Sequence, residues 1–325
     1  MYKYKVFIEN VTCNDTESIH SPDKLVLSGL IASGTKQKGY ALPLIRINTH
    51  QTKSYPEDVS LLFDGYSKEA VIGIVVNAVD IDQNSGWYEN KENISAFAKK
   101  IGEAAVTAYS GNPIAGSESG KYIDSGFQII DTVVNFFINN DKDDVLGSAK
   151  GLIDFNEMEI GQRSTKRFEQ VFRENDDIIV DYNDYSYKIR FRVECEFIMN
   201  PLGEICAKWE SVGAENSFLG LPITVETQCP VKPGRFVHFQ GGSIYWSEDT
   251  KAHIVKGDIR YKWEEMDWEN GAAGFPCEEE KLDLNNYLSQ KFEEGKIIKT
   301  RDEVKFVPNR EILRQGPTTS VHRTG

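Results

Sequence analysis

Two groups of aspartates, at residues 80–82 and 141–144, flank a segment of about sixty residues in the first half of the chain and could bind a metal ion. Asp80 directly follows the apolar run "VIGIVVNAV", and Asp82 lies two residues further on. Asp141, Asp143 and Asp144 lie in "NNDKDDVLG". Calcium takes about six to eight oxygen ligands, which carboxylates on loops at strand ends can supply. These loops are therefore a candidate calcium site. The alternative is that the same side chains only cap turns and face water.

The segments that would position these aspartates have the two-residue period of half-buried strands. "YKYKVFI" places Tyr2, Tyr4 and Val6 on one face, and residues 185–197 alternate in the same way. Residues 70–76 are apolar on both faces, as in a central strand. The pattern predicts a mainly β fold that begins with an antiparallel β-sandwich over residues 1–198.

Two segments of helical spacing interrupt this β pattern. Ile94, Phe97 and Ile101 follow a helical period, and a second run from Phe127 to Phe137 repeats it. We therefore expect inserted helices at about 90–138.

The acidic motifs resemble the calcium-binding sandwich called conserved region two in protein kinase C and synaptotagmin. There a strand runs into Asp-x-Asp and a further Asp precedes x-Ile/Leu-Gly, which corresponds to Asp80, Asp82 and Asp144 here. The resemblance covers the predicted sandwich and implies calcium binding. It also implies that the first calcium loop corresponds to "CNDTESIHSPDKLVLSG", which adds Asp15 and Asp23 to the candidate ligands. The helical insertion departs from that family's pattern.

The last third of the chain contains an internal repeat. "EICAKWESVGAENSFLGLP" aligns with "DIRYKWEEMDWENGAAGFP" at a constant offset of 54 residues. A fixed period of this size indicates stacked supersecondary units. The matched positions are Ile205 and Ile259, Trp209 and Trp263, Gly220 and Gly274, and Pro222 and Pro276.

Each unit has the pattern of a short helix, a Gly-x-Pro turn and β hairpins. The spacing predicts one short helix with Ile205, Trp209 and Val212 on a single face and a second with Ile259, Trp263 and Met266. Gly203 and Asp258 stand at the N-cap positions. Trp209 and Trp263 are expected in the core. After the turn, "RFVHF" leads through two glycines to "SIYW", and "AHIVK" follows. The phrase "FQGGSI" recurs weakly as "FEEGKI", so part of the hairpin is repeated as well.

The elements "LGLP", "AGFP", "GSIYWS" and "KAHIVKGDI" resemble, in this order, the LGFP repeat of bacterial cell-surface proteins. The resemblance covers about 203–300, within a small α+β repeat domain over 199–300. In that family several units form a ring-like array that is thought to bind cell-wall polysaccharide. Fewer than two full units are recognised here, so we expect an incomplete ring. Residues 301–325 lose periodicity and are expected to be a tail.

Four side chains of the repeat are candidates for contact with sugar. Phe239, Tyr245, Trp246 and His253 could form a platform on which a ring face stacks while polar edges bind hydroxyls. Alternatively, they only wedge neighbouring units together, because aromatic residues supply large buried areas in small domains. The sequence leaves both interpretations open.

Composition narrows the function further. The net charge of −13 argues against a nucleic-acid partner, which needs clustered Lys and Arg. "MYKYKVFIEN" has no continuous apolar region or small-residue cleavage site, so we expect no signal peptide. The five cysteines are widely spaced and are expected to be mostly reduced. No GxSxG, HExxH or P-loop motif is present, so we expect no catalytic residues and no enzyme.

These observations favour a bacterial binding protein that recognises cell-surface glycan or cell-wall polysaccharide, with calcium as a candidate cofactor. The alternative is a component of a toxin or secretion apparatus that docks on a target membrane through the calcium-type sandwich. We expect the protein to stay in the cytoplasm until release or export by a non-standard route, and to act at a cell surface. Weak single contacts would favour a homo-oligomer or a larger assembly. An unrecognised hydrolase is the third hypothesis.

Overall fold

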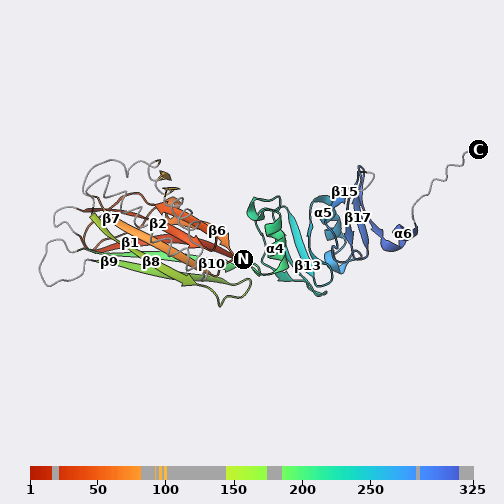
Figure 1. Cartoon of the computed structure of the whole chain (residues 1–325), viewed down its shortest axis with the longest axis horizontal. Coiled ribbons are helices and arrows are strands. Elements are labelled where there is room, and N and C mark those ends of the chain that lie inside the picture. The colour runs from red at the N-terminus through yellow and green to blue at the C-terminus, as the bar shows by residue number, and fades with distance from the viewer. Residues whose placement is uncertain are drawn as a thin grey trace, which may run out of the picture. The chain divides into compact units, whose positions relative to one another are not determined.

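The computed structural model describes residues 1–16, 22–81, 144–173, 185–282 and 286–314, together with residues 92, 95, 96, 99 and 100. Two compact units divide the chain, Met1–Phe197 and Ile198–Gly325 (Figure 1). None of the helices in the described part of the chain has the length and apolar character that a membrane span requires.

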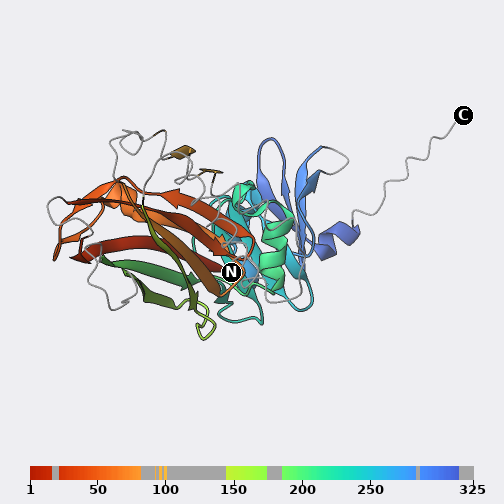
Figure 2. The ribbon, with the colours of Figure 1, turned by 60° about the vertical axis from the view of Figure 1, so that its left-hand side comes forward.

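The first unit is an antiparallel β-sandwich, so the predicted fold class is confirmed (Figure 2). One sheet has the order β5-β1-β10-β9, with β6 also paired to β1, and the other has the order β3-β2-β7-β8, with β4 paired to β2. The elements are β1 (Tyr2–Asp15), β2 (Asp23–Ser33), β3 (Lys36–Ala41), β4 (Ile45–Ile47), β5 (Thr52–Lys53), α1 (Glu57–Ser60), β6 (Leu61–Ser67), β7 (Val71–Asp80), β8 (Asp144–Asp154), β9 (Arg163–Arg173) and β10 (Ser186–Phe197).

Alternating apolar residues of both sheets fill the space between them. Tyr4 and Val6 of β1 and Phe191 of β10 are fully buried in one core cluster that also contains Ile74 of β7. Strand β7 lies between β2 and β8, as its apolar character on both faces predicts. The half-buried pattern predicted from the sequence is therefore confirmed for β1 and β10.

The predicted helical insertion falls largely on residues outside the described part of the chain. Glu92, Ser95, Ala96, Lys99 and Lys100 are helical and exposed. Residues 101–143 lie outside the described residues, so the second inserted helix stays a prediction.

The second unit contains two helix-and-sheet modules of the same design. The first module has a sheet of order β11-β12-β13-β14, and the second has a sheet of order β15-β16-β17-β18. The elements are α4 (Glu204–Ser211), η2 (Ala214–Asn216), β11 (Thr227–Gln228), β12 (Arg235–Phe239), β13 (Gly242–Ser247), β14 (Lys251–Val255), α5 (Gly257–Glu265), η3 (Trp268–Asn270), β15 (Lys281–Leu282), β16 (Leu288–Phe292), β17 (Gly295–Lys299), β18 (Val304–Pro308) and α6 (Asn309–Arg314).

A buried tryptophan holds each Gly-x-Pro turn against its helix. Trp209 Nε1 donates to Gly220 O at 3.0 Å, and Trp263 Nε1 donates to Gly274 O at 3.1 Å. Both indole rings are fully buried, which confirms the predicted core role. The two glycines have φ of 66° and 74°, a left-handed conformation that glycine adopts without strain.

The modules stack, so the first sheet lies between two helices. Trp209 of α4 packs against Phe239 on one face of this sheet, and Trp263 of α5 packs against Tyr245 on the other face. The labels α4, β13, α5, β17 and α6 follow one another in this order in Figure 1. Each module alone would leave one sheet face uncovered, and the next module covers it.

The second module is more complete than the sequence predicted. The expectation of a tail from residue 301 is wrong for residues 304–314, because β18 pairs with β17 and α6 follows it. Residues 315–325 lie outside the described part of the chain. The recurrence was missed because its strand "VKFVP" shares no Ala-His motif with "KAHIV".

Replacing Gly274 with alanine should destabilise the second unit more than replacing Gly257. Both glycines have positive φ, so alanine costs about 1–2 kcal/mol at each. At Gly274 a Cβ would also lie 2.4 Å from Glu293 Oε2 and 2.9 Å from Glu293 Cβ, whereas nothing lies within 4 Å at Gly257.

The clash at Gly274 would break the bond from Phe275 N to Glu293 Oε2. We expect denaturant unfolding to show a further loss of about 1–2 kcal/mol for Gly274→Ala relative to Gly257→Ala. Equal losses for the two variants would contradict the described turn.

Candidate glycan-binding site

The four predicted sugar-contacting residues do not form one platform. Phe239 and Tyr245 are each only 2% exposed, and Phe239 stacks on Trp209 with ring centroids 5.8 Å apart. Neither ring offers a free face to a sugar. The prediction of stacking on these two residues is therefore wrong, because packing between helix and sheet already uses their faces.

Strand alternation also separates the four residues. Tyr245 and His253 are cross-strand partners on the face towards α5, whereas Trp246 pairs with Arg235 on the face towards α4. Trp246 is partly exposed, but its indole Nε1 is buried without a partner among the described residues. Trp246 and His253 keep some exposure on opposite faces of the sheet.

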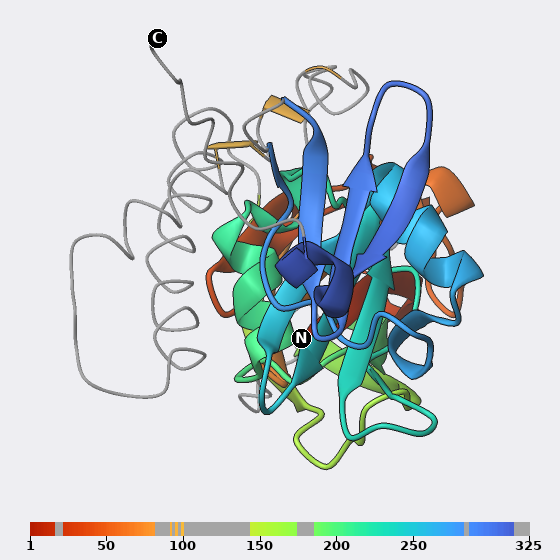
Figure 3. The same cartoon turned by 90° about the vertical axis from the view of Figure 1, so that its right-hand side faces the viewer.

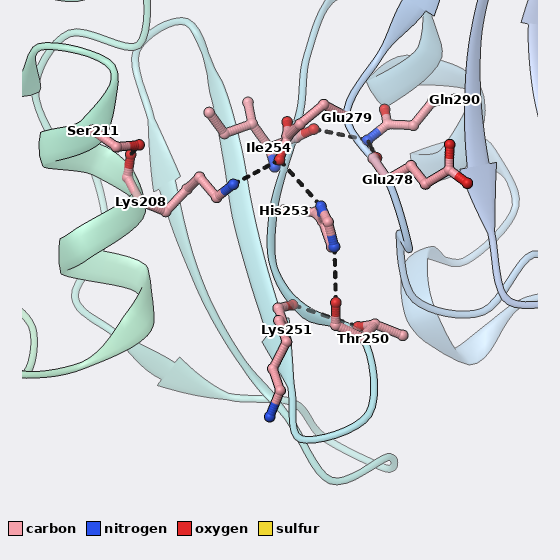
Figure 4. A network of polar contacts seen from close by, with 9 residues as sticks. All are labelled: Lys208, Ser211, Thr250, Lys251, His253, Ile254, Glu278, Glu279 and Gln290. Atoms are coloured by element: carbon pink, nitrogen blue, oxygen red, sulfur yellow. Dashed lines mark hydrogen bonds and ion pairs between the residues drawn. The ribbon is translucent and has the colours of Figure 1, made fainter.

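His253 is held in a polar network that joins three elements (Figure 4). Its Nδ1 lies 3.1 Å from Glu279 Oε1, and its Nε2 lies 2.8 Å from Thr250 O. Lys208 of α4 reaches the same carboxylate at 3.0 Å. Burial acts to raise the pKa of Glu279, but hydrogen bonds from His253 and Lys208 outweigh it and lower that pKa. Both ring nitrogens of His253 are thus engaged by acceptors, which suits a structural tie.

A different set of aromatic residues gathers at the opposite edge of the same junction between the modules. Phe236 of β12 stacks on Tyr245 at 4.9 Å, and Trp268 of η3 stacks on Tyr245 at 6.0 Å. His238 lies 5.4 Å from the Trp268 ring. Phe236, His238 and Trp268 are all partly exposed. We call these residues, together with Ser243 and Arg260, the junction cluster.

A chain of hydrogen bonds orders the polar side of the junction cluster. Arg260 Nε donates to Ser243 Oγ at 2.7 Å, and Ser243 Oγ lies 2.7 Å from His238 Nδ1. The guanidinium of Arg260 also lies over the Trp268 ring, 5.0 Å from its centroid. Burial, with a smaller effect of the Arg260 charge, lowers the pKa of His238 to about 4. The ring is therefore neutral at neutral pH.

The neutral ring carries one proton, and the hydrogen bonds of Ser243 determine which ring nitrogen holds it. Ser243 is fully buried and accepts from Arg260, so its own proton is satisfied when it donates to His238 Nδ1. The imidazole proton then lies on Nε2, which has no hydrogen-bond partner among the described residues. The cluster thus combines two partly exposed aromatic residues with the side-chain N–H groups of His238 and Arg260.

The junction cluster is not part of the repeated framework. In the second sheet, Ser289 and Lys291 stand at the positions of Phe236 and His238, and Lys296 stands at that of Ser243. In the first module, Cys206 and Ala214 stand where the second has Arg260 and Trp268. The helix, turn and sheet of the other module form without these side chains, whereas at this junction Phe236 and Trp268 also pack against the buried cluster of Tyr245 and Trp263.

Residues 219–271 match the family model described as the LGFP repeat. They form an LGFP repeat. The matched segment runs from the first Gly-x-Pro turn through β14 and α5 to the end of η3, and so includes every member of the junction cluster. No curated protein matches the chain.

The predicted calcium ligands of the first unit lie in different surroundings. Asp15 is exposed, whereas Asp23 and Asp80 are 2% and 6% exposed. Asp144 is the cross-strand partner of Asp80, and Leu25 of β2 is the partner on its other side. The backbone therefore brings Asp23, Asp80 and Asp144 to one end of the second sheet.

The two buried carboxylates already have hydrogen-bond partners. Asp80 Oδ1 accepts from Lys24 N at 2.8 Å and from Ile81 N at 2.9 Å. Asp23 accepts from the hydroxyl of Tyr187, and burial together with this bond raises the pKa of Tyr187. Among the described residues no three acidic, His or Cys side chains are grouped to hold a metal ion. The remaining predicted ligands, Asp82, Asp141 and Asp143, lie outside the described residues.

Sequence reasoning missed Phe236, His238, Arg260 and Trp268. Two signals could have found them. Phe236 and His238 alternate in "RFVHF" and so share one strand face, and Arg260 and Trp268 break the repeat at otherwise matched positions. Residues that depart from a repeat are candidates for a role that only one junction performs.

The neutral state of His238 should make the second unit less stable in acid. Its pKa is about 4 in the folded protein, against about 6.5 in an unfolded chain. The stability that depends on the neutral ring is fully present above pH of about 6.5 and declines as the pH falls towards 4.

The variant His238→Asn keeps an acceptor for Ser243 but does not titrate. We expect the difference in Tm between wild type and His238→Asn to shift in favour of the variant between pH 7.5 and pH 5. Tryptophan fluorescence reports mainly on this unit, which contains Trp209, Trp246, Trp263 and Trp268, four of the five tryptophans of the chain. A difference that is independent of pH would contradict the assignment.

Proposed function

We propose that this protein is a non-enzymatic binding protein that recognises bacterial cell-surface glycan or cell-wall polysaccharide through the junction cluster of its second unit. LGFP repeats occur in bacterial cell-surface proteins, which supports a role at the cell surface. The observation that carries the proposal is the cluster itself. Partly exposed rings stand beside the side-chain N–H groups of His238 and Arg260 at one junction, and the matching positions of the other module hold different residues.

The chemistry of the cluster suits a sugar ring. The exposed parts of the Phe236 and Trp268 rings offer apolar contact for the C–H groups of a pyranose, and Tyr245 stacks on both rings. His238 Nε2 and Arg260 can donate to hydroxyl or carboxyl oxygens at the rim. Because Ser243 locks both donors in place, little side-chain entropy is lost on binding.

Binding without catalysis is the better interpretation of the Ser243 and His238 pair. The pair has the distance of a nucleophile and base, but Ser243 is fully buried and its oxygen accepts from Arg260. A substrate carbon could not approach that oxygen without opening the sheet. We therefore propose a scaffold role for Ser243.

Removing the Trp268 ring should weaken binding without unfolding the module. Ala214 holds φ of 50° at the matching position of the first module, and Trp268 has φ of 51°, so alanine fits this backbone. We expect Trp268→Ala to weaken binding to purified cell-wall polysaccharide by about tenfold, measured by titration calorimetry or pull-down. Phe236→Ser, which introduces the residue found at position 289, should act in the same direction.

Tyr261→Ala is the matched control. Tyr261 lies on α5, is 63% exposed and is not in the junction cluster. Its loss should leave binding unchanged. Equal binding by wild type and Trp268→Ala, with intact thermal transitions, would refute the proposed site.

A second candidate function is favoured by the acidic end of the sandwich. The register of β2, β7 and β8 brings the backbones of Asp23, Asp80 and Asp144 to one end of the sheet, and this proximity supports calcium-assisted docking on a membrane or a glycan. A calcium ion there could bridge an acidic rim to phosphate or sugar oxygens. In this alternative the protein is a toxin or secretion component that docks on a target membrane.

Calorimetry with calcium separates this alternative from the first. Asp144→Asn removes one charge from a side chain at the strand end, and we expect it to reduce calcium binding by about tenfold or more if the site forms. Asp64→Asn, which affects a half-exposed carboxylate of β6, is the control. Flotation with anionic vesicles that requires calcium would support membrane docking, and no heat with the wild type would exclude the calcium site.

A further inference from the structure

The second sheet of the repeat unit carries a basic face on the side opposite α5. Phe292 points to Trp263 of α5, so the residues that alternate with it point away. The cross-strand pairs Lys281 with Ser289, Ser289 with Ile298, Ile298 with Lys305, and Lys291 with Lys296 all lie on this outer face. Figure 3 looks onto this sheet, with α6 at one end of it. We call Lys281, Lys291, Lys296 and Lys305 the lysine face.

The charges of the lysine face are not balanced by the described carboxylates. Lys291 and Lys296 stand directly opposite each other, and like charges in such pairs are destabilising. Glu278 contacts Lys281 and lies 3.7 Å from Lys291, and Glu303 lies 2.6 Å from Lys305. Lys296 forms no ion pair with any carboxylate of the described residues. Four ammonium groups thus face two carboxylates, in a chain of net charge −13.

The pKa of Glu278 is sensitive to the positive charge of these lysines. The hydrogen bond from Lys281, with the charges of Lys281, Lys291 and Lys296, lowers the pKa of Glu278. An incoming anion would meet the same attraction, which is strongest where Lys291 and Lys296 converge.

The repeat fold does not explain these lysines. The matching positions of the first sheet hold His238 and Ser243, which belong to the junction cluster and carry no charge at neutral pH. In the first sheet this face is covered by α5, whereas in the second module only the short α6 follows and contacts β17 and β18. The lysines are therefore features of the end of the stack and not of the framework.

We propose that the lysine face binds a phosphodiester-bearing polymer of the bacterial cell wall. Ammonium groups bind phosphate as point charges, and cross-strand neighbours stand about 5 Å apart, close enough for two to share one phosphate. Residues two apart along a strand are about 7 Å apart, so a linear polyanion can engage successive lysines. Ile298 and Val307, the apolar residues of this face, are partly buried, which leaves little for insertion into lipid.

This inference rests on the proposed cell-wall function and adds an anionic ligand to it. The two sites differ in chemistry. The junction cluster would contact sugar rings, and the lysine face would bind the phosphate groups of the polymer backbone. Binding at the lysine face should weaken with added salt, because exposed charge pairs are screened.

The test compares two double variants of the full chain that remove the same number of charges. Lys291→Gln/Lys296→Gln removes the central pair, and Lys251→Gln/Lys262→Gln removes two lysines of the same unit outside the lysine face. The probe is a purified glycerol-phosphate wall polymer, titrated at low salt. We expect the first variant to bind about tenfold more weakly than wild type and the control to bind as wild type does. Since repulsion is relieved, the ligand-free Tm of the first variant should not fall.

Four outcomes decide the matter. Equal weakening by both double variants would overturn the site, and so would unchanged binding by the first. Binding to vesicles of anionic lipid but not to the wall polymer would also overturn it. If wall polysaccharide stripped of phosphate still binds and remains sensitive to Trp268→Ala, while the lysine variant has no effect, the glycan function stands and only this inference fails.

Discussion

One hydrogen bond per module sets the geometry of the second unit. The indole of Trp209 or Trp263 donates to the carbonyl of a glycine eleven residues later, and this draws the Gly-x-Pro turn under the helix. The prolines then pair with Phe239 and Phe292, which places the hairpins against the same indole rings. The glycine at the turn has positive φ, and in this conformation its carbonyl oxygen accepts from the indole N–H. The hydrogen bond therefore depends on both the tryptophan and the glycine.

Each sheet still has a second face to cover, and the packing that covers this face in the first sheet forms the proposed binding surface. A small module cannot bury both faces of its sheet alone. Helices α5 and η3 of the second module cover the open face of the first sheet. Their residues Arg260 and Trp268 contact each other there, and Trp268 also contacts His238. The aromatic residues are thus needed in part for packing and in part remain open to solvent. A binding site at such a junction gains rigidity from the packing that forms it.

The sequence predicted the elements well and the site poorly. Period and repeat placed the strands β1, β7 and β10, the helices α4 and α5, and the buried indole rings, because these depend on local alternation and on side chains that occur twice. Phe239 and Tyr245 were misjudged because an aromatic residue in a strand can face either a helix of its own module or the next one. That choice depends on cross-strand register, which composition does not reveal.

The acidic end of the sandwich shows the same limit. Asp80 and Asp144 are separated by more than sixty residues in the chain but are partners across two strands. The motif spacing indicated both residues. It could not show that Asp23 and Asp80 also serve the fold, through Tyr187 and the backbone of Lys24. Carboxylates at strand ends can accept hydrogen bonds from buried donors or coordinate metal ions, so residue type alone does not distinguish the two roles.

The way the modules stack has a mechanical consequence. Backbone hydrogen bonds of the strands stay within each sheet, whereas the modules contact each other through ring packing and through side-chain bonds, such as those of Glu279 with His253 and Lys208 and the bond from Arg260 to Ser243. Tension along the stack would therefore part the modules before it tore a sheet. A sugar chain that contacts Phe236 of one module and Trp268 of the next would bind across the boundary between the modules. The proposed ligand would then link the two modules at the place where tension separates them first.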